Sequence, residues 1–246
     1  MFEKIPMAHM KIATWNLESI NRLTPGREDA FLNAMEKVEV DVWVLTETWT
    51  DFKLLPGYEL LAQSSKARDL SPERRWVSIW ARSCLTFEQL TIQSQPDRMA
   101  CVRIVQPSQR DVVLVGTVLP WPGDKLWPGA TGFCNALADQ ASDWTRLQEY
   151  NEAGSFLVAG DFNQAIPYQR WYGSKQAAKA LQDQDLVCLT PGSDPLTGKP
   201  RIDHLCIRRD GLRPPVLRQV GTWEIPRLAG KPITDHSGVY ADLDVG

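Results

Sequence analysis

Residues 156–163 of the chain read Phe-Leu-Val-Ala-Gly-Asp-Phe-Asn, an apolar run that stops at an acid and an amide. Four consecutive apolar residues followed by glycine predict a short buried strand that ends in a turn. Asp161 and Asn163 fit such a turn on their own, because both side chains can hydrogen-bond to nearby backbone groups. The stretch indicates more than a turn only if other strand ends of the chain carry comparable side chains.

Four other predicted strand ends do carry acids, amides or histidines. They are, in chain order, Asn16 and Glu18 at the end of the strand 12–17, Glu47 after the strand 42–45, Asp203 and His204 in the strand 202–207, and Asp235 and His236 before the strand 239–243. Each of them alone is explained by a solvated turn or a structural histidine. Active sites collect on loops that a rigid sheet holds in place, so five such ends in one chain favour one shared site.

The remaining pattern places a few helices among many strands. Thr24 and Pro25 predict a helix N-cap followed by proline at the first helical position, and Phe31, Met35 and Val38 fall on one face of that helix. Apolar spacing predicts further helices over 132–149 and 174–184. Additional strands are expected at 58–62, 76–80, 85–92, 101–105, 112–117, 186–189 and 219–223. Two sheets with helices on their outer faces accommodate this order of elements.

Length and composition bound the class of protein. The chain has 246 residues, of which 43% are hydrophobic and 23% charged, which is typical of a globular α/β protein and excludes a disordered, collagen-like or coiled-coil chain. We expect a single domain over residues 11–246, preceded by an N-terminal extension of residues 1–10. Met7 and Met10 precede the first strand, so the true start codon stays open.

Charge and cysteine usage limit the partners and the compartment. The chain carries 27 Lys and Arg against 30 Asp and Glu, a net charge of -3, so a polyanion must be held by a local patch or by a metal ion. Five scattered cysteines without a CxxC pair indicate neither a zinc knuckle nor a disulfide framework and fit a reducing, cytoplasmic location. The apolar runs are too short to span a bilayer. We expect a monomer with no membrane partner.

Taken together, the motifs resemble those of the endonuclease/exonuclease/phosphatase superfamily, which has the deoxyribonuclease-I-like fold. The residues that carry the resemblance are Thr14-Trp15-Asn16-Leu17, Asp41 through Glu47, Gly160-Asp161-Phe162-Asn163, Ile202-Asp203-His204-Leu205 and Asp235-His236-Ser237. The resemblance implies a four-layer α/β/β/α sandwich of two mixed sheets, with the site at one edge of both sheets. It also implies cleavage of phosphoester bonds that depends on Mg²⁺, or on Mn²⁺ in its place.

The resemblance also implies a role for each residue of the site. Glu47 would be the main metal ligand, with Asn16 and Asp235 close to it, because Mg²⁺ prefers oxygen ligands and takes only one or two carboxylates. Glu18 would contact the metal ligands without binding the ion itself, or would bind the ion occasionally. Among the catalytic residues, Asp161 would orient or deprotonate the attacking water, Asn163 would donate a hydrogen bond to the phosphate, and His236 would meet the phosphate with its ring held by Asp203. His204 would face the other side of its strand and be structural.

One position departs from the family pattern. Val118 stands where many family nucleases carry a His or Tyr that contacts the phosphate, and it can neither donate a hydrogen bond nor carry a proton. Trp121, Lys125 or another loop residue would have to substitute, or the chemistry would rely more on the metal and His236. Substrate binding is expected after the G-D-F-N motif, where basic and aromatic side chains suit stacking of an unpaired base beside a phosphate. The candidates are Tyr168, Arg170, Trp171 and Lys175.

Three functions fit these observations. The first is a metal-dependent phosphodiesterase, specifically a nuclease that hydrolyses phosphodiester bonds of nucleic acid. The second is a phosphoesterase acting on a small phosphoester, such as a nucleotide, a sugar phosphate or a lipid headgroup, which the acidic net charge and Val118 favour. The third is a non-catalytic binding protein on the same scaffold. DNA versus RNA and endo versus exo cleavage stay open.

Overall fold

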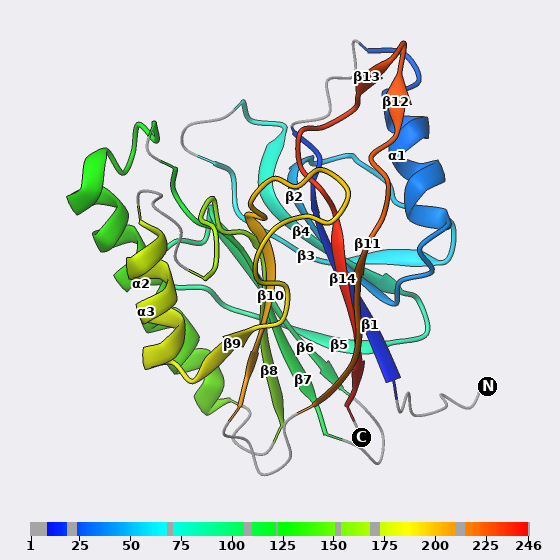
Figure 1. Ribbon diagram of the computed structural model, residues 1–246. Helices are drawn as coiled ribbons and strands as arrows, with labels where there is room; N and C mark the ends of the chain where they lie inside the picture. The colour runs from blue at the N-terminus through cyan, green and yellow to red at the C-terminus, as the bar shows by residue number, and fades with distance from the viewer. Residues whose placement is uncertain are drawn as a thin grey trace.

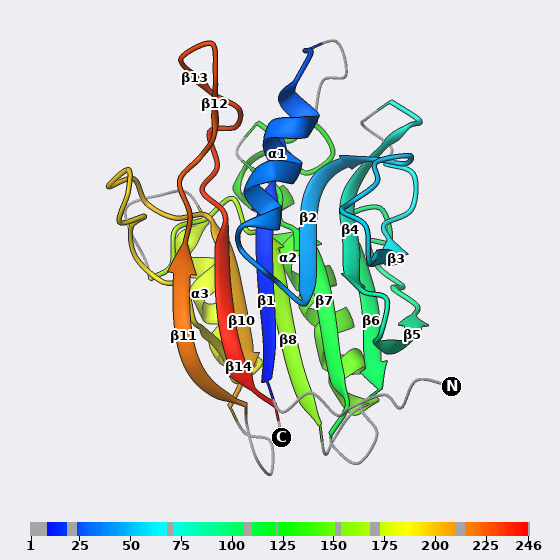
Figure 2. The same ribbon diagram turned by 90° about the vertical axis from the view of Figure 1, so that its right-hand side faces the viewer.

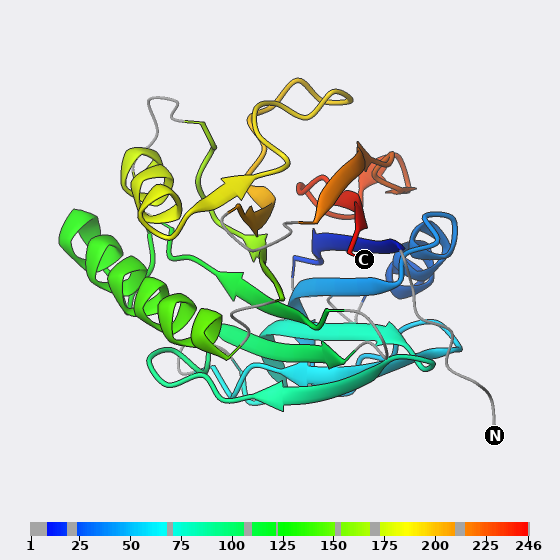
Figure 3. The same cartoon turned by 90° about the horizontal axis from the view of Figure 1, so that it is seen from below.

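The computed structural model describes residues 9–18, 24–67, 71–105, 110–121, 123–150, 154–167, 173–209 and 215–245. These residues form two six-stranded sheets that pack face to face, with α-helices on the two outer faces (Figure 1). Figure 2 shows the first sheet face-on with α1 in front of it, and Figure 3 shows the four layers from below. The predicted α/β/β/α sandwich of two mixed sheets is therefore confirmed.

The first sheet has the strand order β11-β14-β1-β2-β4-β3. Its strands are β11 (Val216–Thr222), β14 (Val239–Asp244), β1 (His9–Asn16), β2 (Val42–Trp49), β4 (Arg74–Arg82) and β3 (Tyr58–Gln63). Only β1 and β2 run parallel among these pairs, and α1 (Arg27–Glu36) connects them. Phe31 and Met35 of α1 are buried against Trp15 and Trp43, which cover the outer face of this sheet.

The second sheet has the strand order β5-β6-β7-β8-β10-β9. Its strands are β5 (Thr86–Leu90), β6 (Met99–Val105), β7 (Val112–Val118), β8 (Ser155–Asp161), β10 (Asp203–Arg208) and β9 (Leu186–Cys188). The parallel pair β7 and β8 is joined by α2 (Gly129–Glu149), and α3 (Ser174–Asp183) lies beside it. Phe133 and Trp144 of α2 are fully buried in the core between the helices and this sheet. A two-stranded hairpin of β12 (Arg227–Leu228) and β13 (Lys231–Pro232), which the sequence does not predict, extends beyond the first sheet.

The two sheets meet through apolar side chains of β2, β4, β7 and β8. Gly116 of β7 lies at a close approach of the two sheets, because a Cβ atom there would be 2.5 Å from Cγ1 of Val77. Among the helices that the structure describes, none is long and apolar enough to cross a membrane.

Several element boundaries differ from the prediction. α1 begins at Arg27, not at Pro25, because residues 24–27 form a turn in which Gly26 adopts a left-handed conformation with φ 77°. β2 continues through Glu47 to Trp49, so Glu47 lies inside this strand. β1 begins at His9 and buries Met10, two residues before the expected domain boundary, while residues 1–8 lie outside the described residues.

Candidate active site

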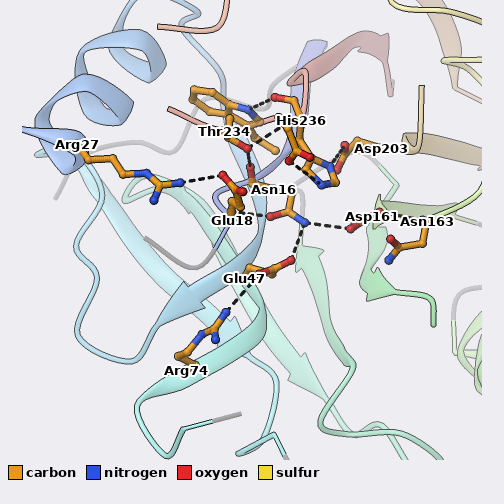
Figure 4. Close-up of polar contacts among 12 residues, drawn as sticks. Asn16, Glu18, Arg27, Glu47, Arg74, Asp161, Asn163, Asp203, Thr234 and His236 are labelled. Carbon is orange, nitrogen blue, oxygen red and sulfur yellow. Dashed lines mark hydrogen bonds and ion pairs between the residues drawn. The ribbon is translucent and has the colours of Figure 1, made fainter. Parts of the chain in front are cut away.

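Polar side chains from both sheets meet at one edge of the sandwich (Figure 4). Asn16 is the last residue of β1, Asp161 the last of β8 and Asp203 the first of β10. Glu47 comes from β2, and His236 from the loop that precedes β14. The shared site that the sequence predicts at these strand ends is thus formed by residues up to 220 positions apart in the chain.

Asn16 links the carboxylates of the two sheets. Its Nδ2 donates to Oε1 of Glu47 at 3.1 Å and to Oδ2 of Asp161 at 2.9 Å. Its Oδ1 accepts the backbone N–H of Glu18 at 2.7 Å. This pattern also fixes which end of the amide is nitrogen, because carboxylates accept hydrogen bonds and a backbone N–H donates one. Asn16 is fully buried and holds Glu47 and Asp161 in place.

Arg74, at the start of β4, is a site residue that the prediction did not include. Its Nη2 lies 3.3 Å from Oε2 of Glu47, and both side chains are about one-fifth exposed. Glu47 is therefore held from two sides, by the amide of Asn16 and by this guanidinium. Arg74 is one of four basic residues between 66 and 75, and the sequence pattern does not single it out.

His236 and Asp203 form a buried ion pair. Nδ1 of His236 lies 2.7 Å from Oδ2 of Asp203, and the side chains are 12% and 2% exposed. Burial alone would lower the pKa of His236, but the charge and the hydrogen bond of Asp203 outweigh it and raise this pKa to about 10. The ring is therefore a cation at neutral pH. Its Nε2 lies 3.6 Å from Oδ1 of Asp235, whose side chain is mostly exposed.

Asp161 completes this group at the centre of the site. Ligand atoms of Asp161, Asp203 and His236 lie within 4.8 Å of one another. Burial, followed by the negative charge of Asp203, raises the pKa of Asp161 to about 7, although His236 and the backbone N–H of Asn163 oppose the rise. Asp161 is thus a carboxylate that can gain and lose a proton near neutral pH.

Strained backbone occurs at this edge of the sheets. Glu18, Glu47 and Asn163 all have φ between 50° and 52°, a left-handed conformation that costs energy for a residue with a Cβ atom. At Asn163 the side-chain Nδ2 donates to the carbonyl of Leu119 at 2.9 Å. Gly160 is required before Asp161, because a Cβ atom there would lie 1.9 Å from the carbonyl oxygen of Thr117. The fold therefore imposes the unusual backbone conformations of Glu18, Glu47 and Asn163 at the site.

The loop that carries His236 is anchored by Thr234 and Trp15, which are not among the predicted site residues. Thr234 donates from Oγ1 to the carbonyl of Asn16 at 3.1 Å and accepts the N–H of His236 at 3.2 Å. Nε1 of Trp15 donates to the carbonyl of His236 at 3.0 Å. These bonds tie the loop to the end of β1, so the position of His236 depends on the same strand as Asn16.

The other predicted residues lie farther from this centre. Glu18 pairs with Arg27 at 3.0 Å, and His204 is buried on the opposite face of β10. Val118 is buried in the core between the sheets, while Trp121 packs against Trp76 with ring centroids 5.6 Å apart. Lys125 is exposed in the loop before α2, and Lys175 is exposed on α3. Tyr168, Arg170 and Trp171 lie outside the described residues.

Two adjoining cavities lie beside the site. One of about 270 Å³ is bounded by Asp203, His236 and Arg201, and one of about 420 Å³ reaches Arg227 of the hairpin. They share Lys199 together with Thr197 and Asp235. The space next to His236 is therefore longer than a single phosphate, and both basic and acidic side chains line it, the acids including Asp194, Asp235 and Glu224.

The chain matches a known protein family in sequence. The sequence profile of the Endonuclease/Exonuclease/phosphatase family matches residues 13–236, so the chain belongs to that family. No protein with a curated description is similar enough in sequence to be matched.

Comparison with solved structures shows the same fold at low sequence identity. The endonuclease/exonuclease/phosphatase from Bacteroides vulgatus has a TM-score of 0.70 at 16% identity, covering 97% of this chain and 99% of that one. The AP endonuclease LMAP from Leishmania major has a TM-score of 0.69 at 15% identity, covering 96% and 88%. TDP2 from D. rerio, complexed with single strand DNA product, has a TM-score of 0.65 at 14% identity, covering 96% and 98%.

Proposed function

We propose that the protein is a metal-dependent phosphodiesterase, specifically a nuclease that hydrolyses phosphodiester bonds of nucleic acid. The observation that carries this proposal is the ion pair of Asp203 and His236 facing the carboxylate of Asp161. A fixed cation opposite a carboxylate that titrates near neutral pH is suited to cleavage of a phosphoester by water. Membership of a family named for nucleases and phosphatases supports the same chemistry.

The residues fit a hard divalent cation such as Mg²⁺, with Mn²⁺ as the alternative. Oδ1 of Asp203 is buried without a hydrogen-bond partner among the described residues, and Glu47 and Asp161 add further carboxylate oxygens to the same site. We propose Glu47 as the main ligand, with Asn16 and Asp235 close to it. The Oδ1 atom of Asn16 accepts one backbone N–H and keeps a second lone pair. A bound metal would lower the pKa of a water and offset charge on the phosphate.

Each catalytic residue has a role that follows from its contacts. Asp161, with its pKa raised to about 7, would accept the proton of the attacking water. His236 would offer Nε2 to a phosphate oxygen, because Asp203 occupies Nδ1. Asn163 would use the second hydrogen of its side-chain amide for the phosphate, since the first is donated to Leu119.

Two observations support nucleic acid as the substrate. The cavities beside His236 extend past one phosphate and offer three cations, Lys199, Arg201 and Arg227, among acidic side chains. Two proteins of the same fold are, by description, an AP endonuclease and an enzyme complexed with single strand DNA product. We further propose Tyr168, Arg170, Trp171 and Lys175 as substrate-binding residues.

A small phosphoester is the second candidate. The net charge of -3 weakens long-range attraction of a polyanion, and the burial of Val118 removes one side chain from the phosphate site. Val118 lies between the sheets, and we do not assign the phosphate contact of the absent His or Tyr to Trp121 or Lys125. Arg74, whose guanidinium lies 3.3 Å from Glu47, is the cation that we propose for contact with the phosphate.

One panel of substrates separates these possibilities. The purified chain would be assayed on single- and double-stranded DNA, RNA, an abasic duplex and small phosphoesters, each with Mg²⁺ and with EDTA. Cleavage of a polynucleotide that EDTA abolishes would support the nuclease. Turnover of small phosphoesters alone would support the second candidate, and binding without turnover of any substrate would indicate a non-catalytic protein. We also propose that the chain is a monomer, which the mass of the same preparation in solution would test. We further propose a cytoplasmic location.

A further inference from the structure

A second cluster of reactive side chains lies on the helix-facing side of the second sheet. Cys188 of β9 is the register partner of Cys206 in β10, so the two cysteines are directly opposite each other across an antiparallel pair. Residues directly opposite in such a pair have Cα atoms about 4.5–5.5 Å apart, within the Cα separation of about 4.4–6.8 Å at which disulfides form. His204 lies two residues before Cys206 on the same face of the strand. The side chain of Asp203 lies on the opposite face, so this cluster is separate from the candidate active site.

The surroundings of His204 favour its charged form. Its Nε2 lies 3.0 Å from the carbonyl oxygen of Gln164, and its Nδ1 lies 3.1 Å from the carbonyl oxygen of Thr190. Carbonyl oxygens only accept hydrogen bonds, so a ring with a proton on each nitrogen satisfies both, while Oγ1 of Thr190 is a third partner 3.3 Å from Nδ1. A buried imidazolium needs a nearby anion, and Sγ of Cys188 lies 3.4 Å from Nδ1.

The two thiols differ in chemical character and in access. A hydrogen bond from Cys206 lowers the pKa of Cys188, burial opposes this, and His204 lowers it further. Burial raises the pKa of Cys206, which is fully enclosed. The guanidinium of Arg201 also interacts with Cys188 through its charge. An open cavity of about 370 Å³ reaches Cys188 and is lined there by Ile166, Pro167 and Leu181.

We propose that Cys188 is a reactive thiolate that reduces hydroperoxides, with Cys206 as the thiol that resolves the product into a cross-strand disulfide. Cys188 attacks the terminal peroxide oxygen, the O–O bond breaks, and Cys188 becomes a sulfenic acid while the alcohol or water leaves. Cys206 then attacks the sulfur of Cys188, the S–O bond breaks, and water leaves with the proton of the thiol. Two thiols lose two electrons, and the peroxide gains them.

Hydrogen peroxide is the probe for this reaction. The full chain, with the exposed Cys84 and Cys134 replaced by serine, would be treated with a few equivalents of peroxide and analysed by mass spectrometry. We expect a loss of about 2 Da that a dithiol reductant reverses, with a cross-linked peptide joining Cys188 and Cys206. In Cys206→Ser, dimedone should instead capture a sulfenic acid at Cys188. In Cys188→Ser, neither product should form.

A second measurement tests the thiolate directly. Alkylation by iodoacetamide at pH 6 should be at least ~10-fold faster at Cys188 than at Cys84 in the unmodified chain, because only a thiolate reacts and an ordinary thiol is protonated at that pH. His204→Gln should remove most of this advantage, and circular dichroism would establish that the variant is folded. Peroxide oxidation of Cys84 or Cys134 while Cys188 stays reduced would overturn the proposal. So would alkylation of Cys188 no faster than that of Cys84 at pH 6.

Discussion

Oδ2 of Asp203 and Nδ1 of His236 lie 2.7 Å apart and join the second sheet to the loop before β14 of the first. The contact leaves Nε2 as the nitrogen of the ring that can meet a substrate. It also sets the charge of the ring, since the carboxylate raises the pKa of His236 to about 10. The two residues therefore form one unit, and replacing both should lower the turnover rate little more than replacing one.

His236→Ala and Asp203→Asn should each lower the turnover rate by ~100-fold or more, the usual scale for an acid–base or charge-stabilising group. The double variant should be little worse than the worse single variant, because groups that act as a unit are not additive. Turnover under saturating substrate would measure all three. Fully additive losses would show that the residues work separately, and near-normal rates in both single variants would place the active site elsewhere.

Glu47→Gln should abolish activity and leave the fold intact. A hard divalent cation needs the carboxylate charge, and a neutral amide binds it poorly. Titration calorimetry with Mg²⁺ should therefore show much weaker binding than in the unmodified chain. Glu88→Gln is the matched control, because Glu88 is exposed on β5 at the far edge of the second sheet. Equal Mg²⁺ affinity in the two variants would remove Glu47 from the metal site.

Asp161→Asn should change how stability depends on pH. The folded-state pKa of Asp161 is raised from 3.8 to about 7, so the unfolded chain loses this proton before the folded one. Folding stability linked to Asp161 is thus fully present below pH 3.8 and is lost as the pH rises towards 7, by an amount on the order of a few kcal/mol. The variant lacks this loss.

Melting temperatures in EDTA at pH 4.5 and pH 8 would measure the effect. The variant gives up a hydrogen bond from Asn16 at every pH, so the informative quantity is its melting temperature relative to the unmodified chain. From pH 4.5 to pH 8, the melting temperature of the variant should rise by several degrees relative to that of the unmodified chain. The size follows because ~1 kcal/mol corresponds to about 2–4 °C in a chain of this size. A constant difference would mean that Asp161 titrates as an ordinary acid.

The sequence predicted the layers of the fold and the strand ends that meet, because both depend on local apolar patterns and on motif order. Arg74 shows why the rest was not predictable. It reaches Glu47 through the antiparallel pairing of β2 with β4, and nothing in the sequence states that register. The same holds for Thr234 and Trp15, whose hydrogen bonds to residues 218 to 221 positions away exist only after the sheets have formed.

The salt dependence of binding distinguishes a polynucleotide substrate from a small one. Each phosphate that a basic side chain neutralises releases counterions, which gives a log–log slope of about -0.7 to -0.9 per phosphate. Binding of an uncleaved oligonucleotide in Ca²⁺ should therefore weaken with salt although the chain is acidic overall.

Paired variants locate the path of the substrate. Lys199→Ala with Arg227→Ala should flatten the slope if the substrate follows the cavities beside His236. Arg170→Ala with Lys175→Ala should flatten it if the substrate follows the segment after Asn163. Lys179→Ala should leave the slope unchanged, because Lys179 already pairs with Asp183 on the exposed face of α3. A flat response in the unmodified chain between low and physiological ionic strength would favour the small phosphoester.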